Sequence, residues 1–96
     1  TLATVLEGCD GDPLPDGITA LGYGYHGKAL IKICLRLASH HDPEPFFISA
    51  RQAGELLNIH FTDASKLLSA LVADRVIDVV EIGSGKRASR YRWIFS

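Results

Sequence analysis

The feature that most constrains this chain is a change of hydrophobic period in its second half. From residue 49 to residue 73, apolar residues recur at spacings of three and four, which predicts two short amphipathic helices joined by a tight turn. From residue 76 to residue 95 the pattern changes to apolar, β-branched and aromatic segments around Gly83 and Gly85, which predicts a hairpin. The sequence therefore predicts an α+β fold in which two helices precede an antiparallel hairpin.

Length and composition bound the class of protein. The 96 residues suffice for one domain with a modest core, and the 47% hydrophobic content favours a globular fold over a disordered chain. No apolar run reaches the roughly 18 residues that a membrane span requires, and no secretory signal pattern is present. We therefore expect a soluble, cytoplasmic protein with no membrane partner. The absence of Met and the start at Thr1 lead us to expect a domain of a larger parent protein.

Cysteine and histidine give little sign of special chemistry. Cys34 falls in the apolar phase of a predicted helix, which favours a buried thiol over the alternative of a Cys9–Cys34 disulfide. The four histidines lack the spacing of metal ligands, and no Gly-rich phosphate loop stands in a strand–loop–helix context. We expect no metal site, no cofactor and no catalytic site.

Charge is distributed unevenly along the chain. The formal net charge is −1, and the first half, residues 1–48, is acidic whereas residues 49–96 are basic overall. Beyond Glu81 the chain carries four cations and no acid; these are Lys86, Arg87, Arg90 and Arg92. The positive charge is thus concentrated in the predicted hairpin, where it could meet a nucleic acid.

The first half of the chain contains an irregular segment and one long helix. Glycine, proline and aspartate punctuate residues 1–27, which we interpret as an arm or linker, with Tyr23 and Tyr25 as candidate anchors to the core. Residues 28–40 carry a broad apolar stripe and form a predicted helix, which the prolines of residues 42–45 end. The apolar run of residues 46–48 then predicts a short buried strand.

The two short helices have recognisable ends and faces. Ser49 has the properties of a helix N-cap, and Asn58 can adopt the left-handed conformation that ends the first helix. Gly54 in that helix suggests close packing against a neighbour. The second helix has an apolar stripe for the core and an opposite face of small polar residues around one cation: Thr62, Ser65, Lys66 and Ser69. That face suits contacts with phosphates and base edges, and it equally suits an ordinary solvent-exposed surface.

From Lys28 to Phe95 the chain resembles the winged helix-turn-helix superfamily. The segment Leu71-Val-Ala-Asp-Arg-Val-Ile-Asp-Val-Val-Glu-Ile-Gly83 looks like the passage from third helix to wing, and Gly85-Lys-Arg-Ala-Ser-Arg-Tyr-Arg-Trp93 resembles the second wing strand. Within the superfamily, the likeness is closest to small domains of phage or plasmid replication proteins of the primase type. The resemblance implies a domain over residues 28–96, with three helices, a short strand and a two-stranded wing. It also implies a third helix that reads DNA beside a wing that grips the backbone.

Two positions depart from the pattern of the superfamily. Arg75 stands where a glycine often precedes the first wing strand, which affects how the helix ends. Asp63 lies in the first turn of the presumed recognition helix, where its charge repels phosphate. It can instead stabilise the positive end of the helix dipole or accept a hydrogen bond from a cytosine amino group.

These observations predict a non-enzymatic DNA-binding module of a replication or transcription-regulating protein, with double-stranded DNA as partner. The expected contacts are Arg51, Thr62, Asp63, Ser65, Lys66, Ser69, Lys86, Arg87, Arg90 and Arg92. Because so few cations give modest affinity, a second copy of the chain or a neighbouring domain would have to raise it. The alternative is a winged helix that mediates protein–protein assembly, which the overall acidity and the sparse charge of the last helix favour.

Overall fold

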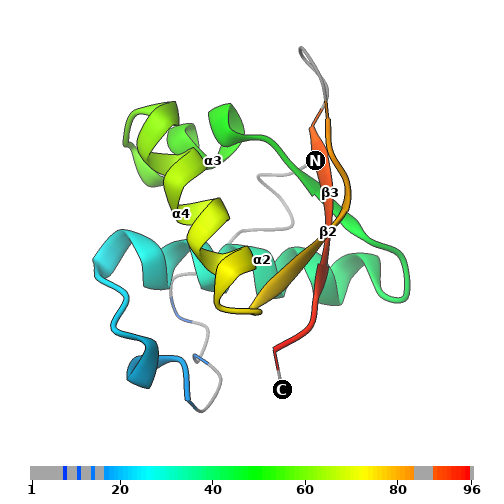
Figure 1. Cartoon of the computed structure of the whole chain (residues 1–96), viewed down its shortest axis with the longest axis horizontal. Coiled ribbons are helices and arrows are strands. Elements are labelled where there is room, and N and C mark those ends of the chain that lie inside the picture. The colour runs from blue at the N-terminus through cyan, green and yellow to red at the C-terminus, as the bar shows by residue number, and fades with distance from the viewer. Residues whose placement is uncertain (1–7, 9–10, 12–13, 15–16, 84–87, 96) are drawn as a thin grey trace.

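The structure of the chain is a computed structural model that describes Gly8, Gly11, Leu14 and residues 17–83 and 88–95. The numbering of its elements follows Figure 1. In order they are η2 (Thr19–Leu21), α2 (Tyr25–His41), β1 (Phe46–Ile48), α3 (Ala50–Leu57), α4 (Phe61–Ala73), β2 (Ile77–Glu81) and β3 (Ser89–Trp93). The predicted α+β fold, with three α-helices and a small antiparallel sheet, is confirmed for these described residues.

The three strands form one antiparallel sheet in the order β1-β3-β2. The central strand β3 pairs with both neighbours, so that Tyr91 lies opposite Phe46 on one side and Val79 on the other. A β-bulge lies between Val79 and Glu81, and it leaves Val80 half exposed. The strands are shorter than the segments 76–82 and 88–95 that the sequence predicted, and the hairpin tip over residues 84–87 lies outside the described residues.

Helix α2 carries the core on which the other elements rest. It contacts α3, α4, β1 and β3, and Figure 1 shows it crossing the molecule behind α4 and the sheet. Its buried residues are Gly27, Leu30, Ile31, Ile33, Cys34 and Leu37, so the expectation of a buried Cys34 is confirmed. The helix begins three residues before the predicted Lys28. Gly27 allows the Tyr23 side chain to pack closely on this first turn, because a Cβ at that position would lie 2.8 Å from Cδ1 of Tyr23.

Residues 17–24, ahead of α2, pack onto this core. Ile18 is fully buried, and the Tyr23 ring lies against the core while its hydroxyl donates a hydrogen bond of 2.5 Å to Asp74 Oδ2. Burial, and then the hydrogen bond to the Asp74 carboxylate, raise the pKa of Tyr23 well above its usual range. Tyr25 is 81% exposed. Of the two tyrosines expected to anchor the N-terminal arm, only Tyr23 does so.

Helices α3 and α4 are joined by a tight turn whose geometry depends on a glycine. Ser49 caps α3 through a capping box with Gln52, and α3 ends at Asn58, whose φ is +59°. The N–H of Ile59 donates back to the carbonyl of Gly54 at 2.9 Å. A Cβ on Gly54 would lie 2.9 Å from the carbonyl oxygen of Ile59, so the close neighbour of this glycine is the turn's own backbone.

Helix α4 ends in the same motif as α3. The N–H of Arg75 donates to Val72, and the N–H of Val76 donates to Leu71, at 3.1 and 2.9 Å. Arg75 has φ +60°, a left-handed conformation that glycine adopts without steric cost. The substitution noted in the sequence thus leaves the helix ending intact and places a side chain where a glycine is usual.

The hairpin has the orientation that the sequence predicted. Tyr91 is buried and Trp93 and Phe95 are partly buried against the core, whereas Arg92 and Ile94 are exposed. Arg90, which the alternation also places on the outward face, is only partly exposed. The helices α3 and α4 lie on one side of the molecule and the β2–β3 hairpin lies on the other (Figure 1). This arrangement leaves the outer side of α4 open toward the hairpin.

Candidate nucleic-acid interface

The outward face of α4 is the first component of the candidate site. All five residues predicted there are exposed: Thr62, Asp63, Ser65, Lys66 and Ser69. The helix begins after His60, whose Nδ1 accepts a hydrogen bond of 3.2 Å from the backbone N–H of Thr62. The same Nδ1 lies 2.5 Å from the side-chain Oγ1 of Thr62. The Thr62 hydroxyl is therefore engaged at the start of the helix, and Asp63 lies in the first turn, near the positive end of the helix dipole.

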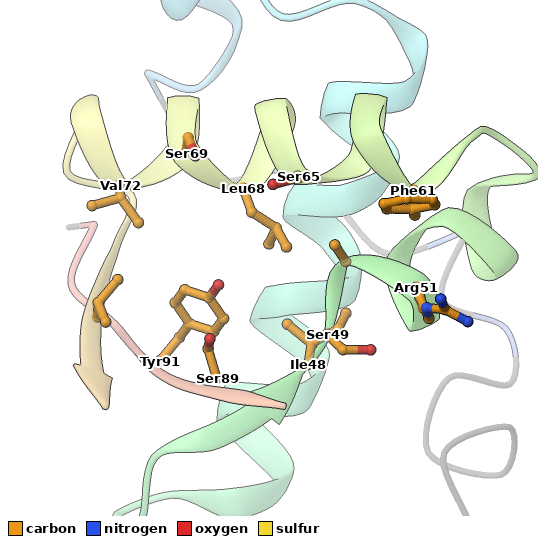
Figure 2. A pocket seen from close by; sticks show the side chains of 12 residues that line it. Ile48, Ser49, Arg51, Phe61, Ser65, Leu68, Ser69, Val72, Ser89 and Tyr91 are labelled. Carbon is orange, nitrogen blue, oxygen red and sulfur yellow. The ribbon is translucent and has the colours of Figure 1, made fainter. Parts of the chain in front are cut away.

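A groove of about 730 Å³ lies between α4, the start of α3 and the sheet (Figure 2). Its polar lining comes from three elements: Ser49 and Arg51 at the start of α3, Ser65 and Ser69 on α4, and Ser89 and Tyr91 on β3. Leu68 and Val72 point into it from α4, opposite Tyr91 on β3 (Figure 2). Among the described residues that line it, none is acidic.

Phe61 closes one end of this groove and was not singled out from the sequence. It is the first residue of α4 and remains 45% exposed. The guanidinium of Arg51 lies 5.7 Å from the centre of its ring, within cation–π range, and the His60 ring lies 4.6 Å away at a tilt of 31°. Its spacing of seven from Leu68 resembles a core position. Phe61 is, however, the first residue of α4, and this position at the helix N-terminus is the signal that could have predicted an exposed ring.

The remaining predicted residues of α4 lie on another side of the helix. Asp63 and Lys66 line a separate hollow of about 440 Å³, together with Tyr25 and His26 at the start of α2. The predicted residues of α4 are thus divided, with Ser65 and Ser69 facing the hairpin and Asp63 and Lys66 facing α2.

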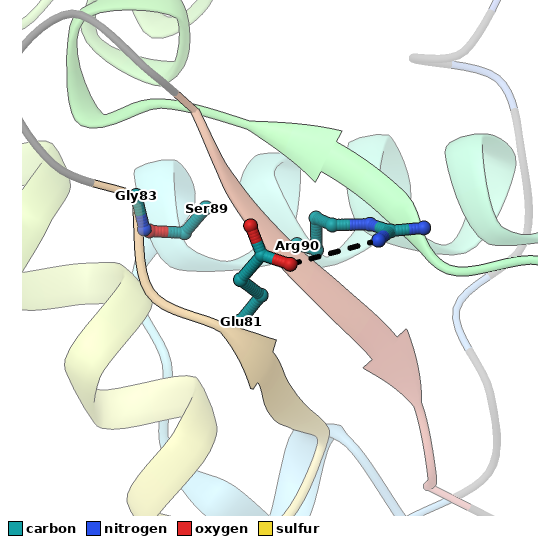
Figure 3. Close-up of polar contacts among 4 residues, drawn as sticks. All are labelled: Glu81, Gly83, Ser89 and Arg90. Atoms are coloured by element: carbon teal, nitrogen blue, oxygen red, sulfur yellow. Dashed lines mark hydrogen bonds and ion pairs between the residues drawn. The ribbon is translucent and has the colours of Figure 1, made fainter.

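Arg90 of the hairpin is held by its neighbours. Its Nη1 lies 3.7 Å from Glu81 Oε2 (Figure 3). Its guanidinium lies 5.0 Å from the centre of the Phe47 ring. The Arg90 Nε is buried and has no hydrogen-bond partner within the described part of the chain. Arg92 is exposed and lies opposite Asp78 in the register of β2 and β3. A carboxylate on β2 therefore pairs with Arg90, and a second one lies opposite Arg92 in the strand register.

Tyr91 and Ser89 on β3 supply neutral hydrogen-bonding groups to the groove. Burial raises the pKa of the Tyr91 hydroxyl, and a hydrogen bond with Ser89 offsets part of that effect. Ser89 Oγ also accepts a hydrogen bond of 3.0 Å from the N–H of Gly83, across the hairpin (Figure 3). A tyrosine hydroxyl is already neutral at pH 7, and burial favours that neutral form further, so Tyr91 offers a hydroxyl group to the groove that it lines.

Two predicted residues, Lys86 and Arg87, lie at the hairpin tip, outside the described residues. Within the described ranges, no three His, Cys, Asp or Glu side chains gather where they could hold a metal ion. No helix in the described part of the chain has the length and apolar character that crossing a bilayer demands. Comparisons with protein-family models, curated proteins and solved structures found no match to this chain.

Proposed function

We propose that this chain is a non-enzymatic DNA-binding module of the winged helix-turn-helix type, with α4 as its recognition helix. The observation that carries the proposal is the composition of the groove beside α4. Arg51 of α3, Ser65 and Ser69 of α4 and Ser89 of β3 surround one concave surface, and no described residue lining it is acidic. Helix, hairpin and a cation from the preceding helix thus meet on one surface, as recognition of a duplex by a helix and a wing requires.

The contacts divide by their chemistry. Ser65 and Ser69 can exchange hydrogen bonds with base edges, because a hydroxyl both donates and accepts. Arg51 and Lys66 are exposed and can neutralise phosphates, and Lys86 and Arg87, which the sequence places between β2 and β3, can do the same. Arg90 and Arg92 contribute less in this proposal, because Glu81 and Asp78 lie beside them.

The number of cations sets the expected affinity. Four phosphate contacts support only modest binding at physiological salt, so the module would act within a larger replication or transcription-regulating protein or as a pair of copies. A cytoplasmic location belongs to the same proposal, because the DNA of a phage, plasmid or bacterial chromosome lies there.

The salt dependence of binding tests the proposal. Fluorescence anisotropy with a labelled duplex should give a plot of log affinity against log salt with a slope of about −3.6, from four phosphates at −0.9 each. Arg51→Gln should reduce that slope by about one phosphate, whereas Arg90→Gln, as the matched control, should change it less. Absence of binding at low salt would contradict the proposal.

A second candidate function, assembly with another protein, rests on exposed apolar side chains. Ile82 is 80% exposed, and Phe47, Val80 and Ile94 are between 42% and 50% exposed. All four lie in or beside the sheet, away from the groove lining. If no DNA binds, this surface of the sheet is where a protein partner should be sought, and a second copy of the chain is the first to test by light scattering.

A further inference from the structure

We propose that the groove beside α4 binds an unpaired nucleobase, so that the module prefers DNA with single-stranded nucleotides next to a duplex. The inference rests on the proposed DNA-binding function and names its substrate more closely. It comes from one juxtaposition: an exposed aromatic ring backed by a guanidinium, at the end of a groove lined by hydroxyl groups.

The ring of Phe61 provides a surface on which a base can stack. It is 45% exposed at the end of the groove, and Arg51 lies 5.7 Å from its centre. Single-stranded nucleic acids are commonly held by aromatic rings, because every base has a flat π surface and stacking does not depend on sequence. The Arg51 guanidinium can neutralise the phosphate of the same nucleotide.

Hydroxyl groups lie where they can meet the edge of a bound base. Ser65 and Ser69 line the groove from α4, and Ser89 and Tyr91 line it from β3. Each is a hydroxyl group that can both donate and accept a hydrogen bond. The groove therefore offers hydrogen bonds to the polar edge of a base as well as a stacking surface.

The size and charge of the groove also fit a nucleotide. Its volume of about 730 Å³ falls within the range of roughly 300–1,000 Å³ that is usual for sites of small organic molecules. Leu68, Val72 and Val79 supply apolar surface, and no acidic side chain among the described lining residues repels a phosphate. The chain has 11 acidic residues in all, yet Arg51 is the one charged side chain among the described lining residues, and its charge is complementary to an anionic ligand.

A base in an intact duplex cannot use this surface in the same way. Its faces are covered by the neighbouring base pairs, and it would have to leave the stack at a cost of a few kcal/mol. An unpaired base at a fork or overhang has no base pair to break, so it avoids that part of the cost. The groove should therefore favour a junction between single and double strands over a blunt duplex.

The test compares a blunt duplex with the same duplex that carries a three-nucleotide overhang, with 2-aminopurine as the first unpaired base. We expect anisotropy to show about tenfold tighter binding of the overhang DNA, and the 2-aminopurine fluorescence to be quenched on binding, because one stacked base has an effect of that order. Phe61→Leu should bring the affinity ratio of the two DNAs close to one and remove the quenching. Phe47→Leu, which removes a similarly exposed ring outside the groove lining, should keep both.

A measurement on the unsubstituted chain keeps the test decisive if Phe61→Leu does not fold. Photocrosslinking from 5-iodouracil at the first unpaired position should label a peptide that contains Phe61. Equal binding of the two DNAs, quenching that persists in Phe61→Leu, or a crosslink outside the residues that line the groove would overturn this inference and leave the proposed function standing. Failure of every DNA to bind would overturn both.

Discussion

The helix-turn-helix and the hairpin of this protein present their charges in opposite ways. Helix α4 has one cation and one carboxylate, and its polar residues are all exposed. The hairpin strands have two arginines, but β2 places Glu81 beside Arg90 and Asp78 opposite Arg92. The hairpin is thus richer in positive charge than α4, but less of that charge is available to a partner in its described strands.

This difference shows that charge along a sequence is not the charge that a partner meets. The run of cations after Glu81 contains no acid, yet antiparallel pairing places the acids of β2 next to it in space. On α4 the one cation, Lys66, shares a hollow with Asp63, but the groove side of the helix faces serines, an arginine and apolar residues, with no acid among the described lining residues. A few polar groups without an acidic neighbour can therefore contribute more to binding than a larger number of cations that lie beside carboxylates.

The tight turn of the helix-turn-helix gives the largest expected effect. Gly54→Ala places a methyl group 2.9 Å from the carbonyl of Ile59, and we expect a loss of about 1–3 kcal/mol in the free energy of unfolding. This outcome is the opposite of the gain of about 1 kcal/mol that alanine would give in an unconstrained helix. Urea denaturation measures it. A more stable variant would show that the turn can adjust to a methyl group on residue 54, and that the contact with the Ile59 carbonyl does not constrain it.

The end of α4 gives the next largest effect, in the stabilising direction. Arg75→Gly relieves a left-handed conformation at φ +60°, and we expect a gain of up to about 1 kcal/mol, because glycine adopts that conformation without steric cost. Asn58→Gly, at φ +59°, is the matched control and should gain less, because asparagine tolerates this region. Thermal unfolding of both variants checks the order. A loss in Arg75→Gly would mean that its side chain stabilises the junction with the hairpin.

The hairpin arginines give the smallest effect and test the comparison directly. Arg90→Ala removes the contact with Phe47 and the pair with Glu81, for which we expect a loss of about 0.5–1 kcal/mol in unfolding free energy. Arg92→Ala, on the same strand and exposed, should stay within about 0.5 kcal/mol of the unsubstituted chain. Equal effects in urea denaturation would show that the two arginines are held alike and that Arg90 is as available to a ligand as Arg92.

Much of the fold could be predicted from local signals. Ser49, Asn58 and the apolar stripe of α4 mark helix ends and a buried face through short-range chemistry, and the structure confirms each of them. The aromatic face of β3 was likewise predictable from alternation.

What could not be predicted depends on contacts between distant segments. The pairing of Arg90 with Glu81 follows from the strand register, and the division of α4 into two sides follows from where α2 and the hairpin pack. Phe61 was missed because its periodicity fits the core, although the open end of the helix leaves its ring exposed. The predicted roles of Lys86 and Arg87 remain predictions.

The anchoring of residues 17–24 has a practical consequence for truncation. Ile18 is buried in the core, and the Tyr23 hydroxyl donates a hydrogen bond to Asp74, which follows the last turn of α4. A fragment that starts at Lys28 would keep every helix–helix contact between α3 and α4, but it would expose the surface under Ile18 and leave Asp74 without its tyrosine partner. A fragment that preserves this packing around the helix-turn-helix therefore has to include Ile18 and Tyr23.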